Sequence, residues 1–202
     1  MAKLPVGGLM FGMGDGNHER IDAQRLNSHL GKFLRIQPDG RVPADNPFVN
    51  REGALPEIDT IGHRNPQGVV MVNGVPYAHK HGARGGDELN RLAPGANYGW
   101  PLTTGGVDYT YALITPYRSL PGITDPLTEW TPSIAPAGLA WYDGALFSAW
   151  RGSLLVAALA ERSVRRVPMV NGTPGAQELL FKGTGQTPAR QRAWGRMAWS
   201  IC

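Results

Sequence analysis

The chain has 202 residues and a hydrophobic fraction of 42%, which is enough for one domain with a substantial core. Its formal charge is +4, but the four cations after Glu178 account for that whole excess, so the charge does not indicate a nucleic-acid-binding face. The single cysteine, Cys202, excludes an internal disulfide framework and a cysteine metal cluster, and no apolar stretch approaches the roughly 18 residues that a membrane span needs.

Short strands separated by turns are predicted along the chain. The 27 glycines and 17 prolines disfavour long helices. Pro-Asp-Gly and Asn-Gly sequences punctuate hairpins because their residues tolerate positive φ. The predicted strands are residues 9–13, 32–37, 68–72, 138–142, 154–159 and 164–170. We therefore predict an all-β fold, and the strand–turn–strand units favour a propeller, a sandwich or a barrel over alternating strands and helices.

Helix is predicted in two places only. One segment is 22–30, which Gly31 would end, and the other is a single turn at 87–92. The stretches 45–56 and 103–133 are interpreted as ordered loops. Loops of this length in a β-rich protein usually carry function.

Three glycine-rich polar segments lie close together in the sequence, at 62–68, 81–90 and 95–101. They combine guanidinium groups, carboxylates and amides with backbone that glycine leaves free to approach a ligand. This composition suits an anionic, oxygen-rich ligand together with a hard cation.

Two of these segments offer specific ligand groups. Arg64 and Asn65 stand between a glycine and a proline, where a planar guanidinium could bind a carboxylate; the alternative is a structural arginine paired with loop carbonyls. Glycines surround Asp87 and Glu88, so carboxylate and carbonyl oxygens are available for calcium; the alternative is a solvated surface turn.

Aromatic and imidazole groups in the same segments have two interpretations each. Tyr98 and Trp100 could stack on a planar ligand or a sugar, or could fill the core beneath a loop. His63 could act as a base, although the neighbouring Arg64 disfavours its charged form. The histidines have no zinc-type spacing.

Six motifs in register resemble one enzyme family. They are residues 30–32, 43–48, 62–68, 81–90, 97–101 and 130–139. Together they strongly resemble the soluble PQQ-dependent aldose sugar dehydrogenases of the glucose/sorbosone dehydrogenase family, over the chain from about Leu9 to Leu180.

The resemblance implies a six-bladed β-propeller, with about half of its blades in a domain at residues 1–182. It implies that pyrroloquinoline quinone (PQQ) binds through calcium and accepts hydride from the C1 hydroxyl of an aldose, which becomes a lactone. Arg64 and Asn65 match the family's quinone-binding pair. Metal ligands are matched by Gly82 and Ala83 for the cofactor's calcium, and by Glu88 and Tyr98 for a second, structural calcium.

Partners and location follow from the same resemblance. The implied partners are an aldose substrate and an external electron acceptor, and the resemblance allows a homodimer for the full-length family. The full-length family is periplasmic or secreted, whereas residues 1–10 of this chain have neither a cationic start nor a long apolar centre. We expect no signal peptide here.

The chain also departs from the family pattern. Lys80 stands where the family usually has glutamate, Ala83 replaces a proline, and Ala160 replaces a cofactor-contacting lysine of some members. The family's histidine base lies in blades upstream of Met1, so no catalytic residue is assigned. We expect the fragment to be inactive.

The last residues, 183–202, lack the family's closing motifs and are interpreted as an aberrant, disordered tail. Codons for parts of this tail, read in other frames, can encode family-like sequences, which favours a frameshift. A rival hypothesis makes the chain a non-catalytic propeller remnant, stabilised by calcium, that binds a sugar or a protein partner.

Overall fold

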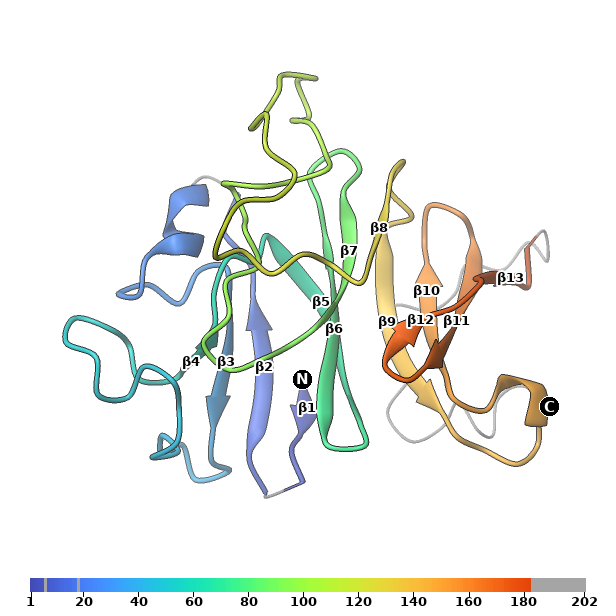
Figure 1. Cartoon of the computed structure of the whole chain (residues 1–202), viewed down its shortest axis with the longest axis horizontal. Coiled ribbons are helices and arrows are strands. Elements are labelled where there is room, and N and C mark those ends of the chain that lie inside the picture. The colour runs from blue at the N-terminus through green and yellow to red at the C-terminus, as the bar shows by residue number, and fades with distance from the viewer. Residues whose placement is uncertain (6, 18, 183–202) are drawn as a thin grey trace. The chain divides into compact units, whose positions relative to one another are not determined.

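The computed structural model describes residues 1–5, 7–17 and 19–182. The chain divides into two compact units, Met1–Ser133 and Ile134–Cys202 (Figure 1). The predicted tail at 183–202 lies outside the described residues. In the part of the chain that is described, no helix is long and apolar enough to cross a membrane.

Two antiparallel sheets form the first unit, and each follows the order of the chain. The first sheet has the order β1-β2-β3-β4 and the second the order β5-β6-β7-β8. Their bounds are β1 Ala2–Lys3, β2 Leu9–Met13, β3 Lys32–Ile36, β4 Ile58–Thr60, β5 Asn65–Val72, β6 Val75–His81, β7 Asp87–Arg91 and β8 Thr128–Trp130. Asn73 and Gly74 turn β5 into β6 with φ values of 49° and 82°, as the Asn-Gly signal predicts.

The second unit contains a five-stranded antiparallel sheet. Its order is β12-β11-β10-β9, and β13 also pairs with β11. The bounds are β9 Pro136–Tyr142, β10 Ser153–Ala158, β11 Ser163–Val170, β12 Thr173–Pro174 and β13 Glu178–Leu180, with a 3-10 turn, η2, at Ser148–Trp150. Every residue of the central strand β10 is buried, which explains its continuous apolar sequence.

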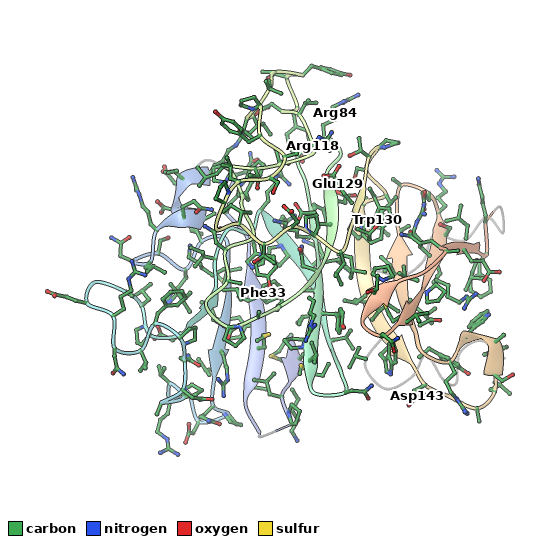
Figure 2. The ribbon with its side chains drawn as sticks, viewed as in Figure 1. Phe33, Arg84, Arg118, Glu129, Trp130 and Asp143 are labelled. Atoms are coloured by element: carbon green, nitrogen blue, oxygen red, sulfur yellow. The ribbon has the colours of Figure 1, made fainter. Side chains whose placement is uncertain are left out.

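The core of the first unit lies between its two sheets. Strands β1 and β2 pack against β5, and Met10, Phe33, Val69 and Leu92 belong to one buried apolar cluster. Figure 2 shows Phe33 among the strands of this unit. Burial of these side chains is the main stabilising contribution that the sheet pair can make.

Two helix predictions are wrong. The predicted helix at 22–30 is instead a short 3-10 helix, η1, at Arg20–Gln24, and the predicted helical turn at 87–92 is strand β7. The long loops are observed as predicted, except that 103–133 contains the short strand β8.

A cavity of about 650 Å³ in the first unit has a mostly apolar wall that includes Asp59. Asp59 is 1% exposed, and neither carboxylate oxygen has a hydrogen-bond partner among the described residues. Burial raises the pKa of Asp59 to about 6, because the ionised form loses its hydration. The carboxylate therefore destabilises the fold wherever it is ionised.

Replacing Asp59 with asparagine is expected to change how stability depends on pH. The folded-state pKa of about 6 lies above the ordinary value of 3.8, so the wild-type chain loses stability as pH rises through 4 to 6. The free energy of unfolding of Asp59→Asn, relative to wild type, should rise by about 2.4 kcal/mol between pH 4 and pH 7. Urea titrations at a series of pH values measure this difference.

Asp39 provides the control. It is exposed, and hydrogen bonds from Arg41 lower its pKa. The free energy of unfolding of Asp39→Asn, relative to wild type, should therefore fall rather than rise with increasing pH. A flat difference between Asp59→Asn and wild type across this pH range would contradict the prediction.

Candidate functional site

One end of the first unit is built from four loop segments, which we call the loop end: residues 14–17 with 19–31, 61–64, 82–86 and 97–111. The meander topology brings the first three together, because β2, β4 and β6 finish at this edge and β3, β5 and β7 begin there. Backbone hydrogen bonds join the segments: Asp15 N donates to Arg64 O at 2.8 Å, and Trp100 N donates to Gly62 O at 3.0 Å. The loop end is therefore a fixed surface.

Arg64 lies at the centre of the loop end and is 6% exposed. Its Nη1 donates to Gly82 O at 2.5 Å and its Nη2 to the Tyr109 hydroxyl at 3.2 Å. The guanidinium carbon lies 5.6 Å from the centre of the Trp100 ring and 5.5 Å from that of Tyr109. Two aromatic rings and a carbonyl thus hold the cation in place.

Two further guanidinium groups contact aromatic rings of the same end. The Arg20 guanidinium lies 5.8 Å from the Trp100 ring centre and pairs with Asp108 at 2.6 Å. The Arg84 guanidinium lies 4.1 Å from the centre of the Tyr111 ring. We call Arg20, Arg64 and Arg84, with the rings of Trp100, Tyr109 and Tyr111, the arginine–aromatic cluster. Figure 2 shows Arg84 among the loops at this end of the unit.

The buried ring of Trp100 packs against two guanidinium groups of the cluster. Its side chain is 1% exposed, and its Nε1 donates to Asp15 Oδ2 at 2.8 Å. The ring therefore fills the core, as one of its two alternatives predicts, and it also lies against the guanidinium groups of Arg20 and Arg64. Stacking of Trp100 on a ligand stays a prediction. Tyr98 is different: it is 2% exposed, and its hydroxyl donates to Arg91 O at 2.6 Å, so its ring fills the core only.

The second predicted quinone ligand, Asn65, begins β5 beside Arg64. It is partly exposed, and its Oδ1 accepts a hydrogen bond from Gln67 Nε2 at 2.9 Å. The structure thus places Arg64 and Asn65 next to each other at the loop end. Their role toward a quinone stays a prediction.

Gly82 and Ala83, the first predicted calcium ligands, lie in the tight loop between β6 and β7. A Cβ on Gly82 would lie 2.0 Å from Gly85 O, so only glycine allows this close approach. Gly82 O already accepts a hydrogen bond from Arg64. A carbonyl has a second lone pair, so this loop still fits a cation when anionic groups offset the charge of Arg64.

The second predicted calcium site is formed differently. Glu88 and the backbone of Tyr98 do face a common point, as the resemblance implies, but Lys80 Nζ lies there. It is 3.1 Å from Glu88 Oε2 and donates to Tyr98 O at 3.0 Å and to Gly62 O at 3.2 Å. These residues do not fit a calcium ion in addition to the ammonium group.

His63 is buried inside the unit and does not face the loop surface. It is 1% exposed, its ring stacks on Tyr98 with centroids 4.8 Å apart, and its Nε2 lies 2.9 Å from Thr60 Oγ1. Burial, and then the charges of Lys80 and Lys32, hold the pKa of His63 well below its usual value. Its surroundings exclude a role as a base toward a bound sugar.

Sequence reasoning missed most of the cluster. Arg20, Arg84 and Tyr109 were not predicted as site residues. Arg84 lies in a glycine-rich segment and Tyr109 in a predicted long loop, whereas Arg20, which precedes the predicted helix at 22–30, gave no signal. Within the described residues, no group of three or more His, Cys, Asp or Glu side chains is arranged to hold a metal ion. A cation bound at this end would therefore need backbone carbonyls among its ligands.

Comparison with known proteins identifies the class to which this fold and site belong. The family model for glucose/sorbosone dehydrogenases matches residues 1–192. A crystal structure of a glucose dehydrogenase superposes with a TM-score of 0.88 at 40% identity, over 91% of this chain and 54% of the other. The chain is thus all-β and represents about half of a six-bladed β-propeller of the quinoprotein glucose dehydrogenase type, as the sequence predicts.

Two other relatives are named for the same chemistry. The aldose sugar dehydrogenase YliI of Escherichia coli is 38% identical over 170 residues, which are 82% of this chain and 45% of that protein. A PQQ-bound aldose sugar dehydrogenase from Streptomyces coelicolor superposes with a TM-score of 0.74 at 28% identity, over 92% of this chain and 49% of the other. The chain belongs to the glucose/sorbosone dehydrogenase family and spans about half the length of these relatives.

Proposed function

We propose that this chain is part of a PQQ- and calcium-dependent oxidoreductase that oxidises the C1 hydroxyl of aldose sugars to lactones. The observation that carries the proposal is the arginine–aromatic cluster: Arg64 is held between the rings of Trp100 and Tyr109, beside Arg20 and Arg84. PQQ is a planar tricarboxylate. Guanidinium groups match its carboxylates, and aromatic rings match its plane.

Distinct tasks are proposed for Arg64, Trp100 and Tyr109 of the cluster and for the neighbouring Asn65. When bound, PQQ supplies the acceptor for the hydride that leaves C1 of the sugar. Arg64 binds a carboxylate of the cofactor, and Asn65 adds a neutral donor and acceptor beside it. Trp100 and Tyr109 keep the Arg64 guanidinium in one position, so little entropy is lost when the ligand binds.

The carbonyls of Gly82 and Ala83 are the proposed ligands of the cofactor's calcium. Because Gly82 O also accepts the hydrogen bond of Arg64, a divalent cation entering alone would be repelled by the guanidinium. Carboxylates of a bound quinone would remove that repulsion. We therefore expect calcium and PQQ to bind this loop together.

The remaining parts of the reaction are proposed to lie outside this chain's described residues. His63 is buried and cannot reach a sugar, so the base that takes the hydroxyl proton has to come from elsewhere in the full-length protein. An external acceptor, a location in the periplasm or outside the cell, and a homodimer of the full-length protein also belong to the proposal. We expect the purified 202-residue chain to bind PQQ without turnover.

A PQQ titration with and without calcium tests this proposal. Arg64→Ala should weaken PQQ binding by about 10-fold or more, because it removes a charge-assisted hydrogen bond. Absorbance changes of PQQ measure the affinity, and reduction of a dye acceptor with glucose measures turnover. Arg41→Ala is the matched control, because Arg41 is exposed and pairs with Asp39, outside the loop end.

The outcomes separate the hypotheses. Equal PQQ affinity of Arg64→Ala and Arg41→Ala would contradict the proposed role of Arg64. Dye reduction by the chain alone would contradict the inference that the base lies elsewhere in the full-length protein. A calcium-induced rise in melting temperature without any change in PQQ absorbance would favour the rival hypothesis of a non-catalytic remnant.

A further inference from the structure

Lys80 Nζ lies inside a cage of oxygen atoms contributed by three parts of the first unit. The cage consists of Gly62 O, Tyr98 O and Glu88 Oε2, at 3.2, 3.0 and 3.1 Å from Nζ. The side chains of Lys80 and Glu88 are 3% and 9% exposed. An ammonium group has three donors, and here each one meets one oxygen.

The chemistry of the cage is that of a hard-cation site. Two backbone carbonyls and a carboxylate are the ligand types that calcium takes in proteins. Asn90 borders the cage: its Nδ2 donates to Glu88 Oε2 at 3.0 Å, which helps to hold the carboxylate in position.

We propose that the Lys80 ammonium group replaces a metal ion in this cage, so that the chain carries its own cation where the family resemblance implies a structural calcium. The ammonium links three segments that lie apart in the sequence: the loop after β4, the strand pair β6–β7, and the loop after β7. Because Gly62 O also accepts a hydrogen bond from Trp100 N, the cage fixes the position of the tryptophan beneath Arg64. The loop end is then held together without a metal at this position.

A lysine in the cage has a different physical consequence from calcium. An ion is exchanged with solvent and is removed by a chelator, whereas Lys80 is covalently part of β6 and is present in every folded molecule. Stability at this position is therefore independent of calcium concentration, which would otherwise add to it by mass action. This inference does not depend on PQQ binding, so it can fail or hold separately from the proposed function.

Substituting Lys80 with glutamate tests the proposal by converting the cage back to an all-oxygen site. Without PQQ, Lys80→Glu should gain one bound calcium per chain and a calcium-dependent rise in melting temperature of several degrees. The same change at an exposed position, Lys3→Glu, should gain neither. Equilibrium dialysis with metal analysis counts the ions, and thermal unfolding with calcium or with a chelator measures the shift.

Glu88→Gln provides a second arm, which is measured both in the Lys80→Glu background and in the wild-type chain. In the Lys80→Glu background it should abolish the new calcium site, whereas in the wild-type chain it should leave calcium binding unchanged. Calcium bound by wild type and lost on Glu88→Gln would overturn the proposal, as would a folded Lys80→Glu that binds no additional calcium. If Lys80→Glu folds only when calcium is present, the proposal is supported. If Lys80→Glu never folds, calcium binding is compared between the wild-type chain and Glu88→Gln: equal binding supports the proposal, and binding that Glu88→Gln removes overturns it.

Discussion

Replacing Gly62 with alanine is expected to lower the free energy of unfolding by about 3–4 kcal/mol. Gly62 has a φ of +79°, and an added Cβ would lie 2.2 Å from Asn97 Oδ1 and 2.6 Å from Gly99 N. The backbone conformation alone costs about 1–2 kcal/mol for a residue with a Cβ, and overpacking against fixed atoms adds about 1–3 kcal/mol. Urea denaturation followed by circular dichroism measures the loss.

Gly74→Ala is the matched control for this prediction. Gly74 has a nearly equal φ of +82°, but nothing lies within 4 Å of its added Cβ. Its substitution should cost only the conformational part, about 1–2 kcal/mol. The difference between the two variants measures the steric cost at Gly62, and two equal losses would contradict the prediction.

The effect at Gly62 should extend to the loop end. Gly62 N donates to Ala23 O, and Gly62 O accepts hydrogen bonds from Trp100 N and from Lys80 Nζ. A shift of this backbone therefore moves the tryptophan and loosens the lysine cage together. We expect Gly62→Ala to weaken PQQ binding more than Gly74→Ala does.

The strands that sequence reasoning predicted share a local signal. Strands β2, β3, β9, β10 and β11 are rich in apolar residues and are bounded by turn sequences, so local pattern suffices to find them. Strand β7 reads Asp-Glu-Leu-Asn-Arg and was predicted as a helical turn. Its first four residues are all buried, on both faces, so the alternation that marks a half-buried strand is absent.

The site residues also differ in whether a local sequence pattern marks them. The placement of Arg64 and Asn65 at one corner could be predicted because glycine, proline and the polar pair stand close together in the sequence, whereas their role toward a quinone stays a prediction. Arg20 and Tyr109 could not, because each lies more than 40 residues from Arg64 along the chain and only the packing of loops brings them together. The sequence shows that Lys80 reverses the charge of the family's usual glutamate. It does not show the oxygen cage, because Gly62 and Tyr98 lie far from Lys80 along the chain and only the fold brings their carbonyls to Nζ.

Replacing Trp100 with alanine is expected to affect both the stability of the fold and the arginine–aromatic cluster. Trp100 is among the largest fully buried side chains, so its truncation should lower the free energy of unfolding by about 3–5 kcal/mol. It would also leave Asp15 Oδ2 without the hydrogen bond from Nε1. Trp100→Phe should cost less, because a ring remains to fill most of the space. Urea denaturation of both variants ranks the two losses.

Trp150→Ala is the control that distinguishes the specific effect of removing Trp100 from the general effect of removing a tryptophan. Trp150 lies in the second unit, is partly exposed and stacks on Phe147. Its substitution should cost less stability than Trp100→Ala and should leave the PQQ affinity of the chain unchanged. A Trp150→Ala variant that weakened PQQ binding as much as Trp100→Ala would contradict a specific role for Trp100.

A double-variant cycle distinguishes a platform for Arg64 from a simple core residue. If the Trp100 ring holds the guanidinium in its binding position, Arg64→Ala should weaken PQQ binding less in the Trp100→Phe background than in wild type, since a phenyl ring attracts a cation less strongly than an indole. The coupling should be about 0.5–2 kcal/mol. Purely additive effects would mean that Trp100 contributes packing alone. Because Asp15 holds the indole through Nε1, Asp15→Asn should reduce the same coupling without removing the ring.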